Sequence, residues 1–402
     1  MRNKPIFYWM FMLSACALLA IGRVYDERLV IANINLVVLV SIIYLFLVVF
    51  MLFSIKKIIL SKSKALFYLF YLLMLLIAPI LWVVFDITEY GFEKFINFWL
   101  IVAPISVVVI EKYDRKDVIN TFCILLGVSC FLALFSALGL SVSERADGRM
   151  AALGGGPIVF SRWMGFGIIS LLLLPVKIKN RYKYSLILIF LILALASGSR
   201  GPILALFLTS LVYLFLNFNR VIIKISLGVF LLVSVLLFSE LGKQISKLGN
   251  SDRVFMNIAK KGGSSQSTST RTNLAIGSFI LLQHYPLGVG AGNWQIVSNE
   301  IRPTHLMPLE YPHNLLLEVA CEYGMQTVLV LVLVFIYIFY LSYNKMLKYR
   351  GYKTSLYPLL FYLFLFLFLN SLISGSLNDS RLLFLIISFV LIHKPLIVPI
   401  DD

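Results

Sequence analysis

Long apolar runs bounded by charged residues dominate the chain and constrain its fold more than any other feature. A helix needs about 20 apolar residues to cross the hydrocarbon core of a bilayer. The composition agrees, because 60% of the residues are hydrophobic and only 13% are charged, against roughly 45–50% and about 25% in soluble domains. A soluble globular protein is therefore excluded. The runs cover residues 5–22, 29–55, 64–85, 92–110, 118–140, 157–176, 183–197, 201–216, 221–240, 314–343, 355–375 and 381–395.

These runs predict an all-α, polytopic integral membrane protein with about twelve transmembrane helices. Residues 1–240 would carry helices 1–9, and residues 314–402 would carry helices 10–12. Residues 241–313 form the one long hydrophilic segment, predicted to be a large periplasmic loop. Loops longer than about 15 residues usually carry function or are disordered, so this loop is a candidate functional segment.

The basic residues predict the orientation. An even number of spans puts both termini on one side, and the segments on that side hold twenty of the 35 Lys and Arg residues, against eight on the short connections of the other side. Short cytoplasmic loops carry the excess of Lys and Arg, so both termini are predicted to be cytoplasmic. The net charge of +16 then reflects topology and anionic inner-leaflet lipid, and a nucleic-acid partner is excluded.

Within the large loop, the Gly-, Ser- and Thr-rich Gly262–Thr270 is predicted to be mobile. Arg271–His284 has helical apolar spacing but is too short to span, so a helix at the membrane face is expected. The following glycines favour a turn with an interfacial Trp294 over a phosphate loop, because no strand precedes them and no Gly-Lys-Ser/Thr follows. The loop ends at His313 and Asn314, where Asn314 is expected to cap the next helix.

The ionisable residues at the outer helix ends indicate chemistry at the outer surface. Carriers usually place charge near mid-membrane, whereas these span cores carry almost none. The sequence has no Asp-x-Asp, no His-Glu-x-x-His and no outer acidic cluster, so few ligands exist for a divalent metal. Arginine binds phosphate through two oxygens and stays charged, and the candidates are Arg162, Arg200, Arg271 and Arg302.

Three outer histidines could act as a base near neutral pH: His284, His305 and His313. His313 is favoured because it precedes a helix with Glu318 and Glu322 on one face behind it. The carboxylates have a second interpretation, since acidic groups stabilise a helix N-terminus.

The arginines also have alternative roles. Arg200 could anchor a span end by snorkelling, and Arg162 follows Gly154-Gly-Gly-Pro157, which could simply start a span. A cation at the start of the loop helix is disfavoured by the helix dipole, which favours a functional role for Arg271.

Three patches, all on the predicted outer side, carry a family resemblance. Ser197-Gly-Ser-Arg200-Gly-Pro-Ile-Leu204 contains Arg-x3-Leu, and Arg271 leads a loop helix into Pro286-Leu-Gly-Val-Gly290. His313-Asn314 is followed after nine residues by Gly324, and after two more by Thr327. In these patches the chain resembles the bacterial O-antigen polymerase and O-antigen ligase superfamily.

The resemblance implies a C-type glycosyltransferase-like membrane enzyme that needs no metal or other cofactor. It implies inverting transfer from an undecaprenyl-diphosphate-linked oligosaccharide on the periplasmic face, with His313 as catalytic base and Arg200 and Arg271 binding the diphosphate. Arg162, Asn314 and Glu318 are further candidates for substrate contact.

The acceptor distinguishes two activities. A polymerase, which the Ser-Gly-Ser-Arg-Gly-Pro and Gly-Gly-Gly-Pro patches favour, extends a second lipid-linked glycan, and a chain-length regulator is then a candidate partner. The alternative is an O-antigen ligase that uses the lipid A core. A flippase for lipid-linked sugars is disfavoured because the spans lack inward charge, and a lipid-linked mannosyl or aminoarabinosyl transferase is disfavoured by the short first outer loop.

Overall fold

The structure is a computed structural model that describes residues 4–21, 29–31, 34–139, 155–217, 266–301 and 311–397, with side chains for all of these except Ile31 and 266–270. The described residues are mostly helical, apart from the antiparallel pair β1 (Val30–Ile31) and β2 (Ile34–Asn35). The first helices are α1 (Ile6–Ile21), α2 (Leu36–Phe53), α3 (Lys62–Leu81), α4 (Glu89–Asn97), the π-helical η2 (Phe98–Val102), α5 (Ala103–Lys112) and α6 (Arg115–Ala137). The rest are α7 (Pro157–Leu173), α8 (Asn180–Ala196), α9 (Arg200–Leu216), α13 (Gln266–His284), α14 (Trp294–Ile301), α15 (Leu315–Lys348), α16 (Tyr357–Ser374), the 3₁₀ turn η4 (Asn378–Ser380) and α17 (Arg381–Val390).

Among the described residues, six helices are long and apolar enough to cross a membrane: α2, α3, the continuous α4–η2–α5, α6, α15 and α16. Three shorter apolar helices are α1, α7 and α9. Each expected span overlaps at least one of the helices above, except 221–240, which lies outside the described residues, and the first residues of the span 29–55 form the strand pair instead. The protein is therefore a mostly helical membrane protein.

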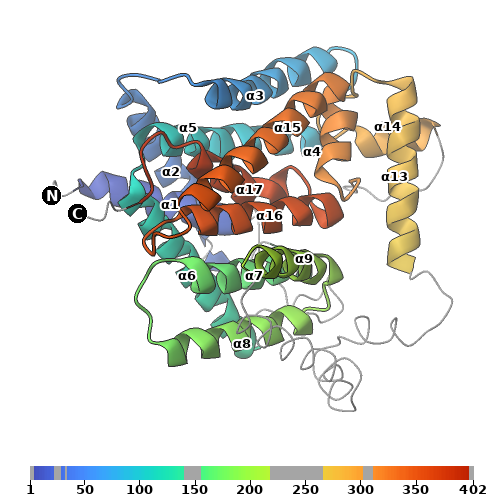
Figure 1. Cartoon of the computed structure of the whole chain (residues 1–402). Coiled ribbons are helices and arrows are strands. Elements are labelled where there is room, and N and C mark those ends of the chain that lie inside the picture. Colours follow the sequence, from blue (N-terminus) through green and yellow to red (C-terminus); the bar gives the residue numbers. More distant parts are fainter. Residues whose placement is uncertain are drawn as a thin grey trace.

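Helix α16 forms the centre of the bundle. Its sequence is apolar on all sides, as expected of a buried helix, and it packs against α7, α9, α15 and α17. Figure 1 shows α15, α16 and α17 in the middle, with α3 above them, α1 and α2 at the left, and α7, α8 and α9 below. Helix α3 lies along α15, and α5 lies along α17.

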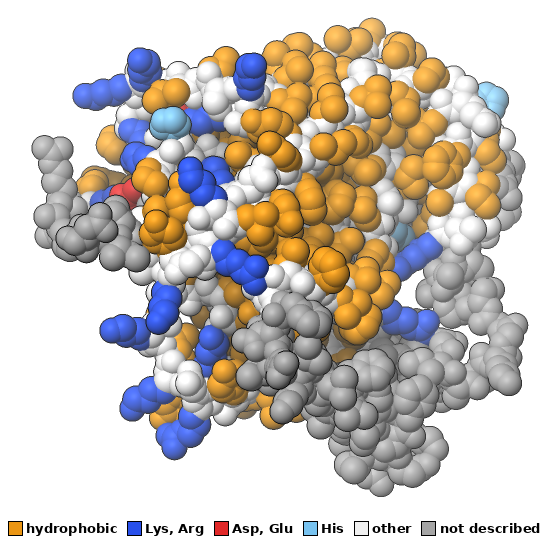
Figure 2. All heavy atoms as spheres, in the orientation of Figure 1, with side chains coloured by type: hydrophobic (Ala, Val, Ile, Leu, Met, Phe, Trp, Pro, Cys, Tyr) orange, Lys and Arg blue, Asp and Glu red, His pale blue; other side chains and the backbone are white. Residues whose placement is uncertain are grey.

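The two ends of the bundle differ in charge. One end holds the start of α1, where Lys4 pairs with Asp117, and the start of α6, where Arg115 donates to the Thr354 carbonyl at 3.0 Å. Figure 2 shows Lys and Arg side chains gathered at this end, beside a broad hydrophobic surface. Helix α13 runs across the opposite end (Figure 1), where α7, α9 and α15 begin.

Candidate functional site

His313 lies in a strained turn at the mouth of α15. Its φ is 55°, and it is the one described non-glycine residue with positive φ, a conformation in which histidine is more common than most residue types. Pro312 precedes it, and the Asn314 side chain caps α15 by accepting hydrogen bonds from Leu316 N at 2.9 Å and Leu317 N at 3.1 Å. The predicted cap is confirmed, and it holds His313 just outside the helix.

The imidazole of His313 is half-buried between groups of opposite charge. Burial, reinforced by the Arg271 cation and opposed by the Asp379 carboxylate, lowers the pKa of His313 to about 4. Its Nδ1 is buried with no hydrogen-bond partner among the described residues. The side chain is therefore neutral at pH 7 and can accept a proton.

Tyr311 links His313 to Asp379. The Tyr311 and His313 ring centroids are 4.3 Å apart, and the Tyr311 hydroxyl lies 3.5 Å from Asp379 Oδ2. Burial raises the pKa of the Tyr311 phenol well above its usual value, so the hydroxyl stays protonated and donates toward the carboxylate.

The last turn of α16 brings three expected site segments together. The Leu372 carbonyl accepts a hydrogen bond from Asn314 Nδ2 at 2.9 Å, and the Ile373 carbonyl lies 3.4 Å from Arg271 Nη1. The first turn of α9 packs here too, because a Cβ on Gly201 would lie 3.1 Å from Ile373 Cγ2. The neighbouring Arg200 is exposed at the start of α9.

Helix α13 begins five residues earlier than expected, at Gln266. Arg271 is therefore not at the helix N-terminus, and the dipole argument made for it does not hold, since the dipole acts on the first turn. Leu274 and Leu281 bury the inner face of α13, while His284 is exposed at its end. Arg302 and His305 lie outside the described residues.

The glycine series forms a turn that is bonded to α15. Gly324 has φ 83° and ψ 165° inside α15, and this break leaves the Cys321 and Glu322 carbonyls free to accept from Val289 N at 2.9 Å and Gly290 N at 3.0 Å. Those N–H groups are not available to a phosphate, so the turn interpretation is confirmed.

Trp294, which follows the glycine series, is buried rather than interfacial. Its Nε1 donates to Ser278 Oγ at 3.0 Å, and this bond holds α14 against α13. The expected interfacial position was therefore wrong, because the turn points the indole inward.

Glu318 and Glu322 form a buried cluster with Lys94 of α4. The exposed fractions are 1% for Lys94, 0% for Glu318 and 2% for Glu322, and Lys94 Nζ pairs with Glu318 and lies 2.5 Å from Glu322 Oε2. Glu318 Oε2 also accepts from Leu377 N at 2.7 Å. Glu318 therefore ties α15 to α4 and to the turn before α17.

Sequence reasoning missed Lys94 because it stands at the end of an apolar run, where a lysine is ordinarily solvated. Its partners could have indicated it. Glu318 and Glu322 are four residues apart and therefore share one helix face, and two carboxylates within an apolar helix need a cation.

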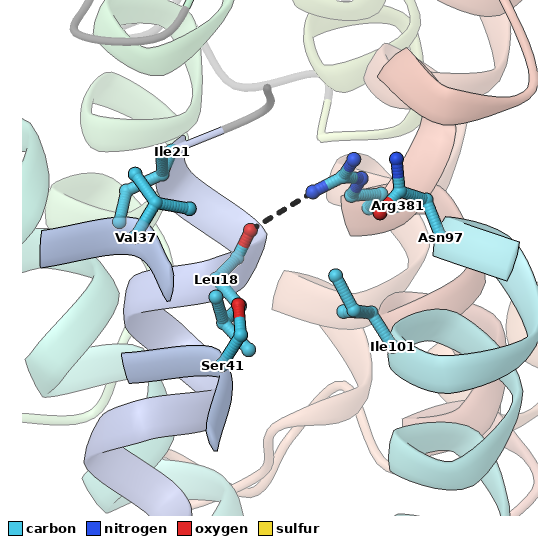
Figure 3. A pocket seen from close by; sticks show the side chains of 7 residues that line it. All are labelled: Leu18, Ile21, Val37, Ser41, Asn97, Ile101 and Arg381. Carbon is cyan, nitrogen blue, oxygen red and sulfur yellow. Dashed lines mark hydrogen bonds between the residues drawn. The ribbon is translucent and has the colours of Figure 1, made fainter. Parts of the chain in front are cut away.

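Arg162 is buried in the first turns of α7 and donates from Nη1 to the Asp379 carbonyl at 2.6 Å. Pro157 starts this helix after Gly156, as expected. Arg381, at the start of α17, is also buried and donates to the Leu18 carbonyl at 3.1 Å. Figure 3 shows this bond, which joins α17 to the last turn of α1. No cluster of three or more potential metal ligands occurs in the part of the chain that the structure describes.

Residues 184–332 match a protein-family model described as Wzy_C, O-antigen ligase. In this segment the chain is similar to the O-antigen polymerase and ligase superfamily, in agreement with the resemblance of its three patches. The matched segment contains Arg200, Arg271 and His313, but neither Arg162 nor Asp379. The match indicates glycosyltransferase-like activity in general and does not separate a polymerase from a ligase. No curated protein matches the chain.

Proposed function

We propose that the protein transfers a glycan from an undecaprenyl-diphosphate-linked oligosaccharide at the periplasmic face of the bacterial inner membrane. The transfer inverts the anomeric carbon and uses protein cations in place of a metal ion. The observation that carries this proposal is the neutral, half-buried imidazole of His313 beside Arg271 at the mouth of α15. A proton acceptor and a phosphate-binding cation are the two groups that this chemistry requires.

In the proposed reaction, a hydroxyl of the acceptor sugar loses its proton to His313 as its oxygen attacks the anomeric carbon. The bond between that carbon and the diphosphate oxygen breaks, and the diphosphate leaves with the electron pair. Arg271 and Arg200 stabilise the charge that develops on the diphosphate. A positioned general base typically contributes about 10²–10⁴-fold.

Donor binding would also strengthen the base. Arg271 lowers the pKa of His313 in the free protein. A bound diphosphate would neutralise this cation and add negative charge nearby, and both effects favour the imidazolium. The imidazole would therefore become more basic when the donor is in place.

The proposed topology has twelve spans, with both termini in the cytoplasm. Residues 1–240 and 314–402 would carry the spans, and 241–313 the periplasmic loop. The gathering of Lys and Arg at the end opposite α13 supports this orientation. The site would then face the periplasm.

We favour a polymerase, whose acceptor is a second lipid-linked glycan. The second candidate is an O-antigen ligase with the lipid A core as acceptor, which the description of the matched family favours. The test incubates the purified protein with undecaprenyl-diphosphate oligosaccharide and a chelator, with and without lipid A core. Elongated lipid-linked glycan identifies a polymerase, glycan joined to the core identifies a ligase, and no product in either mixture rejects the proposal.

The His313→Ala variant should lose transfer while still inserting into the membrane, because it removes the base but keeps the Asn314 cap that starts α15. The His393→Ala variant is the matched control, since His393 is an exposed histidine near the C-terminus, after α17. Glycan synthesis is measured at equal expression. Near-normal synthesis by His313→Ala would contradict the assignment of the base.

The Arg200→Lys and Arg271→Lys variants should lose most activity although the charge is kept, because an ammonium cannot bind two phosphate oxygens in the guanidinium geometry. Arg350→Lys is the control, because Arg350 bonds Asn217 on the far side of the bundle. Full activity of both site variants would refute diphosphate recognition by these arginines.

A further inference from the structure

A small pocket lies between the last turn of α1, the first turns of α7 and the turn that leads into α17. Its polar lining comes from Arg162, Asn378, Asp379 and Arg381. Its cavity volume is about 20 Å³, and a water-sized group needs about 10–15 Å³. The pocket therefore admits one small polar substituent rather than a whole sugar ring.

The pocket presents buried polar atoms that the described part of the protein does not satisfy. Arg162 is 5% exposed, and only its Nη1 is hydrogen-bonded there, to the Asp379 carbonyl at 2.6 Å. Its Nε and Nη2 have no partner among the described residues, and neither has Asn378 Oδ1. Buried polar atoms are nearly always paired in folded proteins. Two donors and one acceptor match a hydroxyl group, which both accepts and donates.

Arg381 lines the pocket and holds two of the helices around it together. Its bond to the Leu18 carbonyl fixes the last turn of α1 against α17. The same side chain lines a second small pocket on the other side of that turn, together with Ser41 and Asn97 (Figure 3). The wall of the first pocket is therefore set by contacts among three helices.

Two side-chain contacts connect this pocket to the candidate base. Asp379, which lines the pocket, is bonded to Tyr311, and the Tyr311 ring packs on His313. Arg271 approaches His313 from α13 and bonds the last turn of α16. The imidazole therefore has a cationic neighbour, Arg271, on one side and the Tyr311–Asp379 contact that leads to the pocket on the other, and the diphosphate of the donor accounts for only the first.

We propose that Arg162 and Asn378 form an acceptor subsite that binds one hydroxyl substituent of the acceptor sugar and places the attacking hydroxyl at His313. The inference rests on the proposed glycosyl transfer and assigns the second substrate of that reaction. Arg162 Nε and Nη2 donate to the substituent, and Asn378 Oδ1 accepts from it.

The test separates transfer to a sugar from transfer to water. The donor is the undecaprenyl-diphosphate-linked repeat unit, isolated from a strain that lacks the gene. The acceptor is the octyl glycoside of the same repeat unit, which can accept but cannot donate. Mass spectrometry measures both the octyl-linked product and the free glycan released by donor hydrolysis.

Arg162→Gln should raise the acceptor KM roughly tenfold, because hydrogen bonds from a charged donor are lost, and Asn378→Ala should raise it by a smaller factor. Donor hydrolysis should be unchanged in both, because the diphosphate site is intact. Arg115→Gln is the matched control, since Arg115 also bonds a main-chain carbonyl but at the other end of the bundle. Arg271→Lys should lose both reactions.

An unchanged acceptor KM in both pocket variants would overturn the acceptor subsite, and so would a parallel fall in transfer and hydrolysis. Asn378→Ala keeps the test decisive if Arg162→Gln does not fold. A wild-type protein that neither transfers nor hydrolyses the lipid-linked glycan would instead reject the proposed function itself.

Discussion

His313 receives opposing electrostatic influences that the reaction would change. Burial and Arg271 lower its pKa and Asp379 raises it, and the resulting pKa is about 4 in the free protein. A base with so low a pKa is unprotonated throughout the physiological range but has little affinity for a proton. The basicity of His313 during the reaction therefore depends on the negative charge of the bound diphosphate.

The pH dependence should show this change. The acidic limb of kcat/KM, which reports the free enzyme, should fall near pH 4, because below that value His313 is protonated and cannot act as a base. The acidic limb of kcat, which reports the substrate complex, should lie at higher pH, because the bound diphosphate favours the imidazolium. Steady-state rates over a pH series check both limbs, and coincident limbs would contradict the tuning by the donor.

The role of a residue could be predicted where its partners are close in the sequence. It could not be predicted where its partners are distant in the sequence. Asn314 caps a helix two and three residues ahead, and Arg271 and His313 stand in recognisable patches. Lys94 pairs with carboxylates more than 220 positions away, and the role of Asn378 depends on a pocket shared with α7 and α1. The spacing of residues in the sequence does not show which of them meet across such distances.

At the scale of elements, the break in α15 organises the site end. The break at Gly324 frees the carbonyls that bind the glycine turn, and this turn joins α13 and α14 to α15. The family pattern His-Asn-x9-Gly therefore contains a cap and a helix break, both with local physical roles.

The Gly324→Ala variant should be destabilised by about 1–3 kcal/mol or more, because its conformation is reserved for glycine and the new Cβ would lie 2.3 Å from the Leu287 carbonyl oxygen. Thermal unfolding in detergent measures the effect. Gly127→Ala is the control, since a Cβ there would touch nothing within 4 Å and alanine favours a helix. Equal melting temperatures for the two variants would contradict the role of the break.

The Lys94→Met variant should be strongly destabilised, because removal of one partner from a buried ion pair costs about 3–5 kcal/mol and leaves Glu318 and Glu322 without a cation. Adding Glu318→Gln and Glu322→Gln should restore much of the folded yield, measured by size-exclusion chromatography. A triple variant no better than Lys94→Met would show that the lysine acts by packing alone.

Most elements could be predicted from apolar runs, but their boundaries could not. Helix α13 begins in a Ser- and Thr-rich segment whose residues disfavour helix interiors, so composition predicted a mobile segment up to Thr270. The structure shows helix from Gln266, and residues 262–265 lie outside the described part.

At the scale of the whole molecule, composition predicted a helical membrane protein, and the sorting of Lys and Arg predicted which ends of the helices lie together. The central position of α16 could not be predicted, because every span is apolar and no pattern ranks one as more buried. Its contacts with α7, α9, α15 and α17 depend on shape complementarity among similar helices.

The orientation can be tested with single cysteines in a background without the four native ones. A cysteine at the exposed Thr272 of α13 should react with an impermeant maleimide in spheroplasts, because that end is predicted to face the periplasm. A cysteine at the exposed Lys353 should react only after lysis. The reverse pattern would contradict the proposed topology.

The hydrogen bonds between the glycine turn and α15 join the helix that carries Arg271 to the helix that follows His313, because α13, the turn and the start of α15 are connected along the chain and across it. If this joined unit tilts to admit a long polymer, Arg271 and His313 move away from the reaction site together. A donor that has only partly entered would then meet neither, which protects the energy-rich lipid carrier from wasteful breakdown between rounds of synthesis.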